Sequence, residues 1–184
     1  MTAKNTTTEN YDIKELGERP EHYDAVAGMV FEHWPEEVLA CDGCATKAEY
    51  CGLLRSRGGA GTLVAVCRET GDLAGTVSVV ENDLPDRPWL GPWLASLVVS
   101  PEHRRRGLGA ELVRRAVDLA RQTEPDLRML YLWTRRELLP FYKNLGWSAI
   151  EVTTHMGNSH SNNDAAHDPY ICIMKYNLRN SWFN

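Results

Sequence analysis

The sequence predicts an α/β (α+β) fold in which helices flank a mixed central sheet. Three observations predict it. The 184 residues, 43% hydrophobic and 24% charged, are enough for one packed core. The spacing of apolar residues switches repeatedly between the two-residue period of strands and the 3.6-residue period of helices. The resulting order is strand, two helices, three strands, helix, strand, helix and two strands, which fits neither a regular βαβ series nor an all-β protein.

The first third of the chain is expected to be mainly helical. Gly43 interrupts the apolar periodicity there, and the pair Gly58-Gly59 ends it. The expected segments are a flexible N-terminal tail (1–10), a short strand (11–16), an amphipathic helix (18–34) and a second helical stretch (35–59).

The middle of the chain carries the clearest strand signals. Residues 61–82 form two β-rich runs on either side of "ETGD", which predicts a hairpin. Residues 93–100 form an apolar run with few polar positions, which predicts a central strand buried on both faces. After Pro101 the period becomes helical, with one apolar stripe. The stripe consists of Leu108, Leu112, Val113, Ala116, Val117 and Ala120.

The last third is predicted to finish the sheet. The expected segments are a buried strand (129–134), a short helix (135–147) ending at Gly146, and two strands (148–155 and 169–177) separated by a polar stretch (156–168). We find no internal repeat and no strong linker. We therefore expect a single domain over residues 11–178, followed by a C-terminal tail over 179–184.

Composition excludes several classes of function. The net charge is −5, and residues 1–50 hold eleven acidic side chains against four basic ones. Nucleic-acid-binding domains are usually basic as a whole, so no nucleic-acid partner is expected. No apolar run approaches the length of a membrane span, and the polar N-terminus lacks the core of a signal peptide. Five cysteines, an odd number at irregular spacing, do not form a secreted disulfide framework, so we expect a cytoplasmic protein.

The strongest chemical signal is the segment "LVVSPEHRRRGLGA", residues 97–110. It ends a strand, turns at Pro101 and enters a helix through Arg-x-x-Gly-x-Gly. A helix start exposes unpaired N–H groups and carries partial positive charge, and glycines let a ligand approach the backbone closely. Three consecutive arginines add attraction, so the segment predicts a site for an anion such as a pyrophosphate. A solvated helix start is the alternative interpretation of this segment alone.

This strand, turn and helix resemble the acetyl-CoA-binding motif of the GNAT N-acetyltransferases, Arg/Gln-x-x-Gly-x-Gly/Ala after a Val-x-Pro strand end. Arg104, Gly107 and Gly109 occupy the motif positions. "FYKNLGW", residues 141–147, is similar to the Phe-Tyr-x-x-x-Gly-Phe/Trp segment that follows the fifth strand in this family. The resemblance covers about residues 11–178. It implies a mixed, mostly antiparallel central sheet of six to seven strands, splayed between the fourth and fifth strands and flanked by helices.

The resemblance also implies roles for individual residues. Tyr142 matches the family's general acid, which protonates the departing thiolate. Main-chain groups of the fourth strand are implied to hold pantetheine, and the loop and helix start are implied to hold the pyrophosphate. The implied acetyl-CoA residues are Leu97, Val98 and Val99 for pantetheine, and Arg104, Arg105, Arg106, Gly107, Leu108, Gly109 and Ala110 for the pyrophosphate.

The general base is the point at which the sequence departs from the family pattern. Some relatives carry a carboxylate or histidine on the fourth strand, and residues 89–100 contain neither. We take Glu81, at the end of the third strand, as the candidate base acting through ordered water. Asp83, just after that strand, is the alternative, and both could equally be turn residues or bind the amine by charge.

The function that follows is transfer of acetyl from acetyl-CoA to a primary amine of a small molecule, by direct attack in a ternary complex. No metal is expected, and a homodimer is possible. The acidic first 50 residues favour a cationic acceptor. Two alternatives stay open: a catalytically weak acetyl-CoA sensor or regulatory module, and an acetyltransferase for protein or peptide amines.

Three further patterns are weaker. Cys41, Cys44 and Cys51, with His33 upstream, suggest zinc, but only one Cys-x-x-Cys pair is present where zinc ribbons normally supply two. A trio of histidines in the polar stretch between the last strands is more often solvated than functional. Two tryptophans around "LGP" could line an acceptor pocket or only cap the sheet. These residues are His155, His160 and His167, and Trp89 and Trp93.

Overall fold

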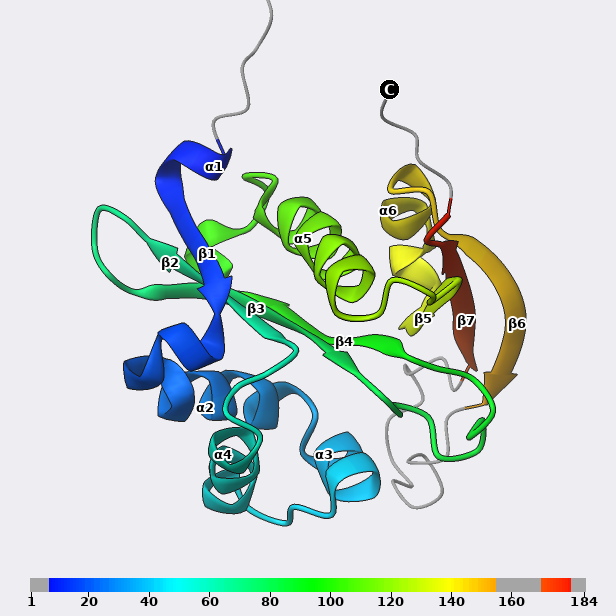
Figure 1. Cartoon of the computed structure of the whole chain (residues 1–184), viewed down its shortest axis with the longest axis horizontal. Helices are drawn as coiled ribbons and strands as arrows, with labels where there is room; N and C mark the ends of the chain where they lie inside the picture. Colours follow the sequence, from blue (N-terminus) through cyan, green and yellow to red (C-terminus); the bar gives the residue numbers. More distant parts are fainter. Residues whose placement is uncertain (1–6, 155–169, 180–184) are drawn as a thin grey trace, which may run out of the picture.

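A computed structural model describes residues 7–154 and 170–179 of the chain. It contains a seven-stranded sheet of order β1-β2-β3-β4-β5-β7-β6, as Figure 1 shows. All neighbouring strands are antiparallel except β4 and β5, which are parallel. This confirms the predicted mixed, mostly antiparallel sheet. The strands are β1 (Tyr11–Glu15), β2 (Thr62–Cys67), β3 (Leu73–Val80), β4 (Trp93–Val99), β5 (Met129–Arg135), β6 (Ser148–Thr154) and β7 (Tyr170–Asn177).

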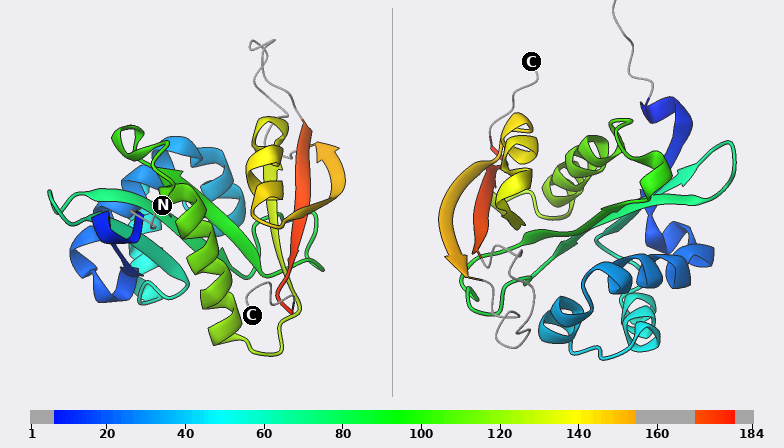
Figure 2. Two further views of the ribbon diagram at one scale, coloured as in Figure 1. Left: turned by 90° about the horizontal axis from the view of Figure 1, so that it is seen from above. Right: turned by 180° about the vertical axis from the view of Figure 1, so that it is seen from behind.

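Helices cover both faces of the sheet. In Figures 1 and 2, α2, α3 and α4 lie against one face, and α5 and α6 lie on the other. The α-helices are α1 (Thr7–Asn10), α2 (Tyr23–His33), α3 (Pro35–Asp42), α4 (Lys47–Ser56), α5 (Leu108–Thr123) and α6 (Leu139–Asn144). Short 3-10 turns are η1 (Leu16–Glu18), η2 (Pro20–His22), η3 (Pro101–His103) and η4 (Arg136–Leu138). None of the helices in this part of the chain is long and apolar enough to cross a membrane.

The helical segments before residue 60 follow local sequence signals. Gly43 adopts the left-handed conformation that ends α3 (φ 70°), as its position in the sequence predicts. Thr46 and Glu49 form a capping box at the start of α4, with the Glu49 N–H donating to Thr46 Oγ1 at 3.2 Å. Within the expected tail, Thr7–Asn10 form one helical turn. The expected helix over 18–34 begins later, at Tyr23, after two 3-10 turns.

The predicted stripe of α5 packs on the sheet. All six of its residues are buried, and they join the largest core cluster with side chains of β2, β3 and β5. Gly75 of β3 lies under this helix, where an added Cβ would come within 2.7 Å of the Val98 carbonyl oxygen and 3.1 Å of Leu112 Cδ1. The absence of a side chain at residue 75 therefore lets α5 sit close to β3 and β4.

Strand β4 is central, as predicted, but its middle is only partly buried. Ser78 pairs with Ala95 and Thr76 pairs with Val98, so two residues of β4, Ser96 and Leu97, oppose a single residue of β3. Ser96 has a positive φ of 53°, which marks a β-bulge. The expectation of burial on both faces is wrong here, because Ser96 and Leu97 border a gap in the sheet rather than a neighbouring strand.

That gap lies between β4 and β5. The two parallel strands share one register pair, Trp93 with Tyr131, and the Tyr131 N–H donates to the Pro92 carbonyl oxygen at 3.0 Å. Beyond Trp93 the strands separate toward their carboxyl ends (Figure 1). The predicted splay between the fourth and fifth strands is therefore confirmed, and it leaves one edge of β4 without a partner strand.

Candidate active site

The loop between β4 and α5 lies at the open end of the gap. The turn η3 ends at His103, Arg105 takes a left-handed φ of 58°, and Gly107 takes a φ of 83° immediately before α5. The first-turn N–H groups of α5 at Leu108 and Gly109 have no carbonyl partner within their own helix. Together with the exposed arginines of the loop, they form a positive region that suits an anion.

The start of α5 touches both sides of the gap. Gly109 lies between Val99 of β4 and Phe141 of α6, since a Cβ added to it would be 3.7 Å from Val99 Cγ2 and 3.7 Å from Phe141 Cζ. Arg104 turns back onto the same strand, with its Nε donating to the Val99 carbonyl oxygen at 2.9 Å. The predicted loop residues and the predicted strand residues are thus neighbours in space.

A cavity of about 360 Å³ occupies the gap on the side of α2 and α3. Its walls come from five separate parts of the sequence between residues 30 and 142. The residues that concern the chemistry are Glu37, Cys41, Asp42, Asp83, Leu97 and Tyr142, and the remaining walls are mostly apolar. Of the predicted catalytic and acetyl-CoA residues, Leu97 and Tyr142 line this cavity.

Tyr142 reaches the cavity from α6. Its ring packs edge-on against Phe141, with centroids 4.9 Å apart, and only 6% of the residue is exposed. Burial raises the pKa of Tyr142 to about 12, so its hydroxyl keeps its proton at neutral pH. Gly146, with a φ of 90°, allows the turn after α6, where the Trp147 N–H donates to the Tyr142 carbonyl oxygen at 3.1 Å. The motif "FYKNLGW" therefore positions this side chain locally.

Asp83 reaches the same cavity from the connection between β3 and β4. Its carbonyl oxygen accepts hydrogen bonds from Cys41 Sγ at 3.5 Å and from Trp133 Nε1 at 3.1 Å, which fix this part of the loop to α3 and β5. Burial raises the pKa of the Asp83 carboxyl to about 8. A hydrogen bond from Trp133 opposes that rise, and the carboxyl groups of Asp42 and Glu37 add to it. Asp83 is therefore mostly protonated at pH 7, and it becomes able to accept a proton as the pH approaches 8.

Glu81 lies elsewhere. It is exposed, and it lines an adjoining cavity of about 350 Å³ under α4 rather than the cavity that Tyr142 lines. The two cavities share a wall that includes Cys41, Asp42, Asp83 and Ser96. Of the two carboxyl groups that the sequence suggests as bases, Glu81 lines only the second cavity, whereas Asp83 lines both.

The cavity in the gap is lined by more carboxyl groups than basic side chains. Glu37, Asp42 and Asp83 line it together with Arg135 and His33, and the one ion pair formed by these carboxyl groups within the described residues joins Asp42 Oδ1 to Arg57 Nη1 at 3.3 Å. Burial and three nearby carboxylates raise the pKa of the Cys41 thiol to about 12, so this thiol is neutral. A cation would be attracted to such a cavity.

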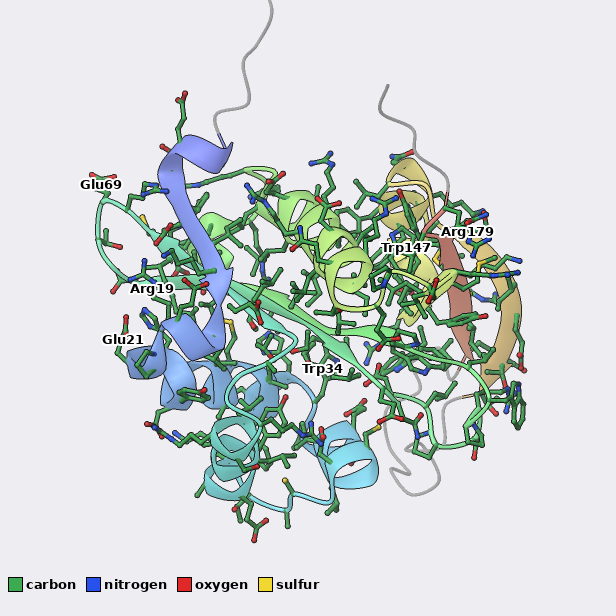
Figure 3. All side chains as sticks on the ribbon, viewed as in Figure 1. Arg19, Glu21, Trp34, Glu69, Trp147 and Arg179 are labelled. Atoms are coloured by element: carbon green, nitrogen blue, oxygen red, sulfur yellow. The ribbon has the colours of Figure 1, made fainter. Side chains whose placement is uncertain are left out.

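Sequence reasoning missed the aromatic walls. Trp34 and Trp133 line the cavity, and Figure 3 shows Trp34 beneath the sheet at the junction of α2 and α3. The tryptophans that the sequence analysis considered lie elsewhere. Trp93 is fully buried in the core, whereas Trp89 is 73% exposed beside Arg87. The sequence feature that could have identified Trp34 is the following Pro35, which marks the break between the two helices.

The three clustered cysteines have different partners. Cys41 Sγ donates to the Asp83 carbonyl oxygen, Cys44 Sγ to the Asp42 carbonyl oxygen at 3.6 Å, and Cys51 Sγ to Asp24 Oδ1 at 3.3 Å. Over residues 7–154 and 170–179, no group of three or more His, Cys, Asp or Glu side chains is arranged to hold a metal ion. His155, His160 and His167 lie outside the described residues.

Comparisons with known proteins identify the family. The model of the acetyltransferase (GNAT) family matches residues 19–147, and no curated protein sequence matches the chain significantly. Solved structures with this fold include spermidine/spermine N-acetyltransferase SpeG from Vibrio cholerae in complex with manganese ions (TM-score 0.65, 13% identity, 92% of this chain and 94% of that one). They also include an aminoglycoside 6'-N-acetyltransferase complexed with coenzyme A (TM-score 0.60, 17% identity, 91% and 97%).

A further structure, nourseothricin acetyltransferase, is 24% identical over 64% of each chain, with a TM-score of 0.48, so this chain spans less than two thirds of its length. The structural likenesses establish the fold, and the family model covers most of the sequence, including the β4–α5 loop and Tyr142. The chain belongs to the GNAT acetyltransferase family.

Proposed function

We propose that this enzyme transfers the acetyl group of acetyl-CoA to the primary amine of a cationic small molecule, by direct attack in a ternary complex. The observation that carries the proposal is that Asp83 and Tyr142 line one cavity, at the point where the unpaired edge of β4 is accessible. A base and an acid on one cavity are what amine attack on a thioester requires.

The chain has features that fit acetyl-CoA at both ends of the gap. The exposed arginines, the left-handed residues and the first turn of α5 suit the pyrophosphate. Main-chain groups on the free edge of β4 suit the amide-bearing pantetheine arm. We assign to pantetheine Leu97, Val98 and Val99, and to the pyrophosphate Arg104, Arg105, Arg106, Gly107, Leu108, Gly109 and Ala110. Acetyl-CoA supplies the thioester, and the protein supplies orientation and proton transfer.

We assign the base to Asp83 rather than to Glu81. An ammonium group must lose a proton before its nitrogen can attack, and a carboxyl with a pKa of about 8 becomes ionised, and so able to accept that proton, as the pH approaches 8. The freed lone pair forms the C–N bond at the thioester carbon. We assign stabilisation of the oxyanion to an N–H of the bulge around Ser96 and Leu97, because a bulge withdraws its main-chain groups from the ladder.

Tyr142 completes the reaction as the general acid. When the C–S bond breaks, the departing thiolate takes the proton of the Tyr142 hydroxyl. The pKa of about 12 keeps the Tyr142 hydroxyl protonated at neutral pH. The attacking nitrogen becomes positively charged as the C–N bond forms, and it loses a second proton to solvent when the intermediate collapses. The proton taken by Asp83 also leaves to solvent, and the one lost by Tyr142 is replaced from solvent, so each turnover releases one proton.

Charge supports a cationic acceptor. Glu37 and Asp42 bring negative charge to the cavity against the positive charge of Arg135, and Asp83 adds to it as it ionises toward pH 8, while Trp34 and Val38 provide apolar walls for the body of a small molecule. Two proteins that share the fold are a spermidine/spermine N-acetyltransferase and an aminoglycoside 6'-N-acetyltransferase. A domain over residues 11–178, a homodimer and a cytoplasmic location stay predictions.

An amine panel tests the proposal. Thiol release from acetyl-CoA should be measured with diamines, amino sugars, arylalkylamines, amino acids and a lysine peptide, each as a matched pair with its N-methylated quaternary form. We expect turnover with a cationic primary amine and none with its quaternary partner. Turnover confined to the peptide, or to neutral and anionic amines, would contradict the proposed acceptor class.

A further inference from the structure

A buried contact ties the first strand to the β4–α5 loop. The Tyr11 hydroxyl and His103 Nδ1 are 3.0 Å apart, and the two rings meet edge-on with centroids 5.5 Å apart. Tyr11 is 3% exposed and His103 is 8% exposed, although they are 92 residues apart in the sequence. The loop that follows His103 is exposed from Arg104 to Gly107.

His103 is the last buried residue before that exposed stretch. Its N–H donates to the Ser100 carbonyl oxygen at 2.9 Å, and the Ser100 N–H donates to the Ala74 carbonyl oxygen at 2.9 Å. The side chain of Ser100 also donates to the Leu73 carbonyl oxygen at 3.2 Å. One end of the η3 turn is therefore fixed to β3, and its other end is fixed by the contact of His103 with Tyr11.

Tyr11 is itself firmly held. It is the first residue of β1, it pairs with Cys67 of β2, and it belongs to the core cluster that includes Leu108, the first residue of α5. The buried anchors His103 and Leu108 thus stand on either side of residues 104–107. Arg105, between them, holds the left-handed φ of 58°, a conformation that L-residues with side chains avoid unless the surroundings fix it.

We infer that the Tyr11–His103 contact is a positioning element for the β4–α5 loop, which sets affinity for the phosphate-bearing part of acetyl-CoA and leaves the chemical step unchanged. The inference rests on the proposed use of this loop for the pyrophosphate. Neither residue lines the cavity that contains Tyr142 and Asp83. An altered loop should therefore change binding of the nucleotide end and not proton transfer at the thioester.

The test compares two acetyl donors in Tyr11→Phe, which keeps the ring and removes the hydroxyl. Acetyl-CoA carries the pyrophosphate, and S-acetylpantetheine lacks it. For acetyl-CoA we expect the Kd, measured by titration calorimetry, to rise about 5- to 10-fold, because one hydrogen bond is lost. We expect kcat for this donor to stay unchanged. For S-acetylpantetheine we expect kcat/KM to be the same in the variant and the parent.

Two controls keep the inference falsifiable. Tyr23→Phe removes a hydroxyl from another buried tyrosine, in the core cluster under the opposite face, and should leave both donors unaffected. His103→Phe breaks the same contact from the loop side. Combined with Tyr11→Phe, it should raise the Kd no more than either single variant, because the two changes remove one interaction.

Equal losses for the two donors would overturn the inference, as would an unchanged Kd for acetyl-CoA in folded Tyr11→Phe. If Tyr11→Phe does not fold, His103→Phe carries the same comparison of donors. If the parent acetylates no amine, the proposed function fails, while the calorimetric Kd of acetyl-CoA in parent and variants still decides the role of this contact.

Discussion

The two halves of the active site are built in different ways. The β4–α5 loop takes its residues from one continuous stretch, 104–110, which is exposed from Arg104 to Gly107 and is positively charged. The cavity takes its residues from positions between 30 and 142 and is lined by three carboxyl groups against one arginine. A local stretch of backbone is enough to bind a phosphate, whereas a cavity with a base and an acid needs several elements of the tertiary structure.

The difference in charge also separates the two substrates. Phosphate groups are attracted to the start of α5 and repelled by the carboxylates of the cavity, and a cationic amine experiences the reverse. The β4–β5 gap joins the two regions, so the thioester is the place where the two substrates meet. Changes in the cavity should therefore lower turnover, and changes in the loop should weaken binding.

Among the variants considered, Tyr142→Phe is expected to lower turnover the most. Loss of the general acid should lower kcat by about 10²- to 10⁴-fold, while the Kd of acetyl-CoA stays within about twofold of the parent, because the ring and its contact with Phe141 remain. Steady-state kinetics and calorimetry measure the two quantities. Tyr131→Phe, on β5 beside Trp93, is the matched control and should leave kcat unchanged. If Tyr142→Phe turns over like the parent, the tyrosine only packs.

Asp83→Asn should lower kcat/KM for the amine by about 10²-fold and alter its pH profile. A base acts when deprotonated, so with a pKa of about 8 the parent's kcat/KM should rise with pH through about 8 and then level off. The variant should lack this rise. The pKa of Tyr142, about 12, places the loss of the acid above the usual assay range.

Glu81→Gln is the matched control for this change, because it converts an exposed carboxylate two residues away into an amide. It should keep the rise in rate through about pH 8. A larger loss of activity in Glu81→Gln than in Asp83→Asn would restore Glu81 as the base and remove Asp83 from the mechanism.

In the loop, Arg104→Ala combined with Gly107→Ala should raise the Kd of acetyl-CoA by about tenfold or more. One change removes a charge, and the other places a Cβ on a residue with a φ of 83°, which strains the turn where a phosphate must approach. At saturating acetyl-CoA, kcat should recover to nearly the parent value. Arg115→Ala removes the same charge about two turns along α5 and should leave the Kd unchanged. A lowered kcat at saturation would show that the two halves are not separable.

Most of the fold could be predicted from sequence because its signals are local. The apolar stripe of α5, the hairpin of β2 and β3 and the glycine that ends α3 each depend on residues close together in the chain. The bulge at Ser96 and the partial exposure of β4 could not be predicted in the same way. Both depend on β5, which pairs with β4 at one position and then diverges.

The residues of the site show the same contrast between local and tertiary signals. The loop motif and Tyr142 were found from short patterns, and their placement follows from residues such as Gly107 and Gly146 that act locally. The choice between Glu81 and Asp83 could not be made from the sequence, because two residues of separation in a loop say nothing about which side chain reaches Tyr142. Trp34 was missed for the same reason, since its role depends on the angle between α2 and α3.

Asp83 also makes a prediction about stability. The pKa of the carboxyl is about 8 in the folded protein, against an ordinary value of 3.8. Between these values the folded state binds more protons than the unfolded state, so this group lowers the free energy of unfolding as pH rises from about 4 to 8. Asp83→Asn removes that contribution. Its melting temperature relative to the parent should therefore increase by about 10 °C between pH 5 and 8, and calorimetric melting at pH 5, 6.5 and 8 measures it. A difference that stays constant with pH would mean that Asp83 is ionised throughout, and that it holds the amine by charge rather than taking its proton.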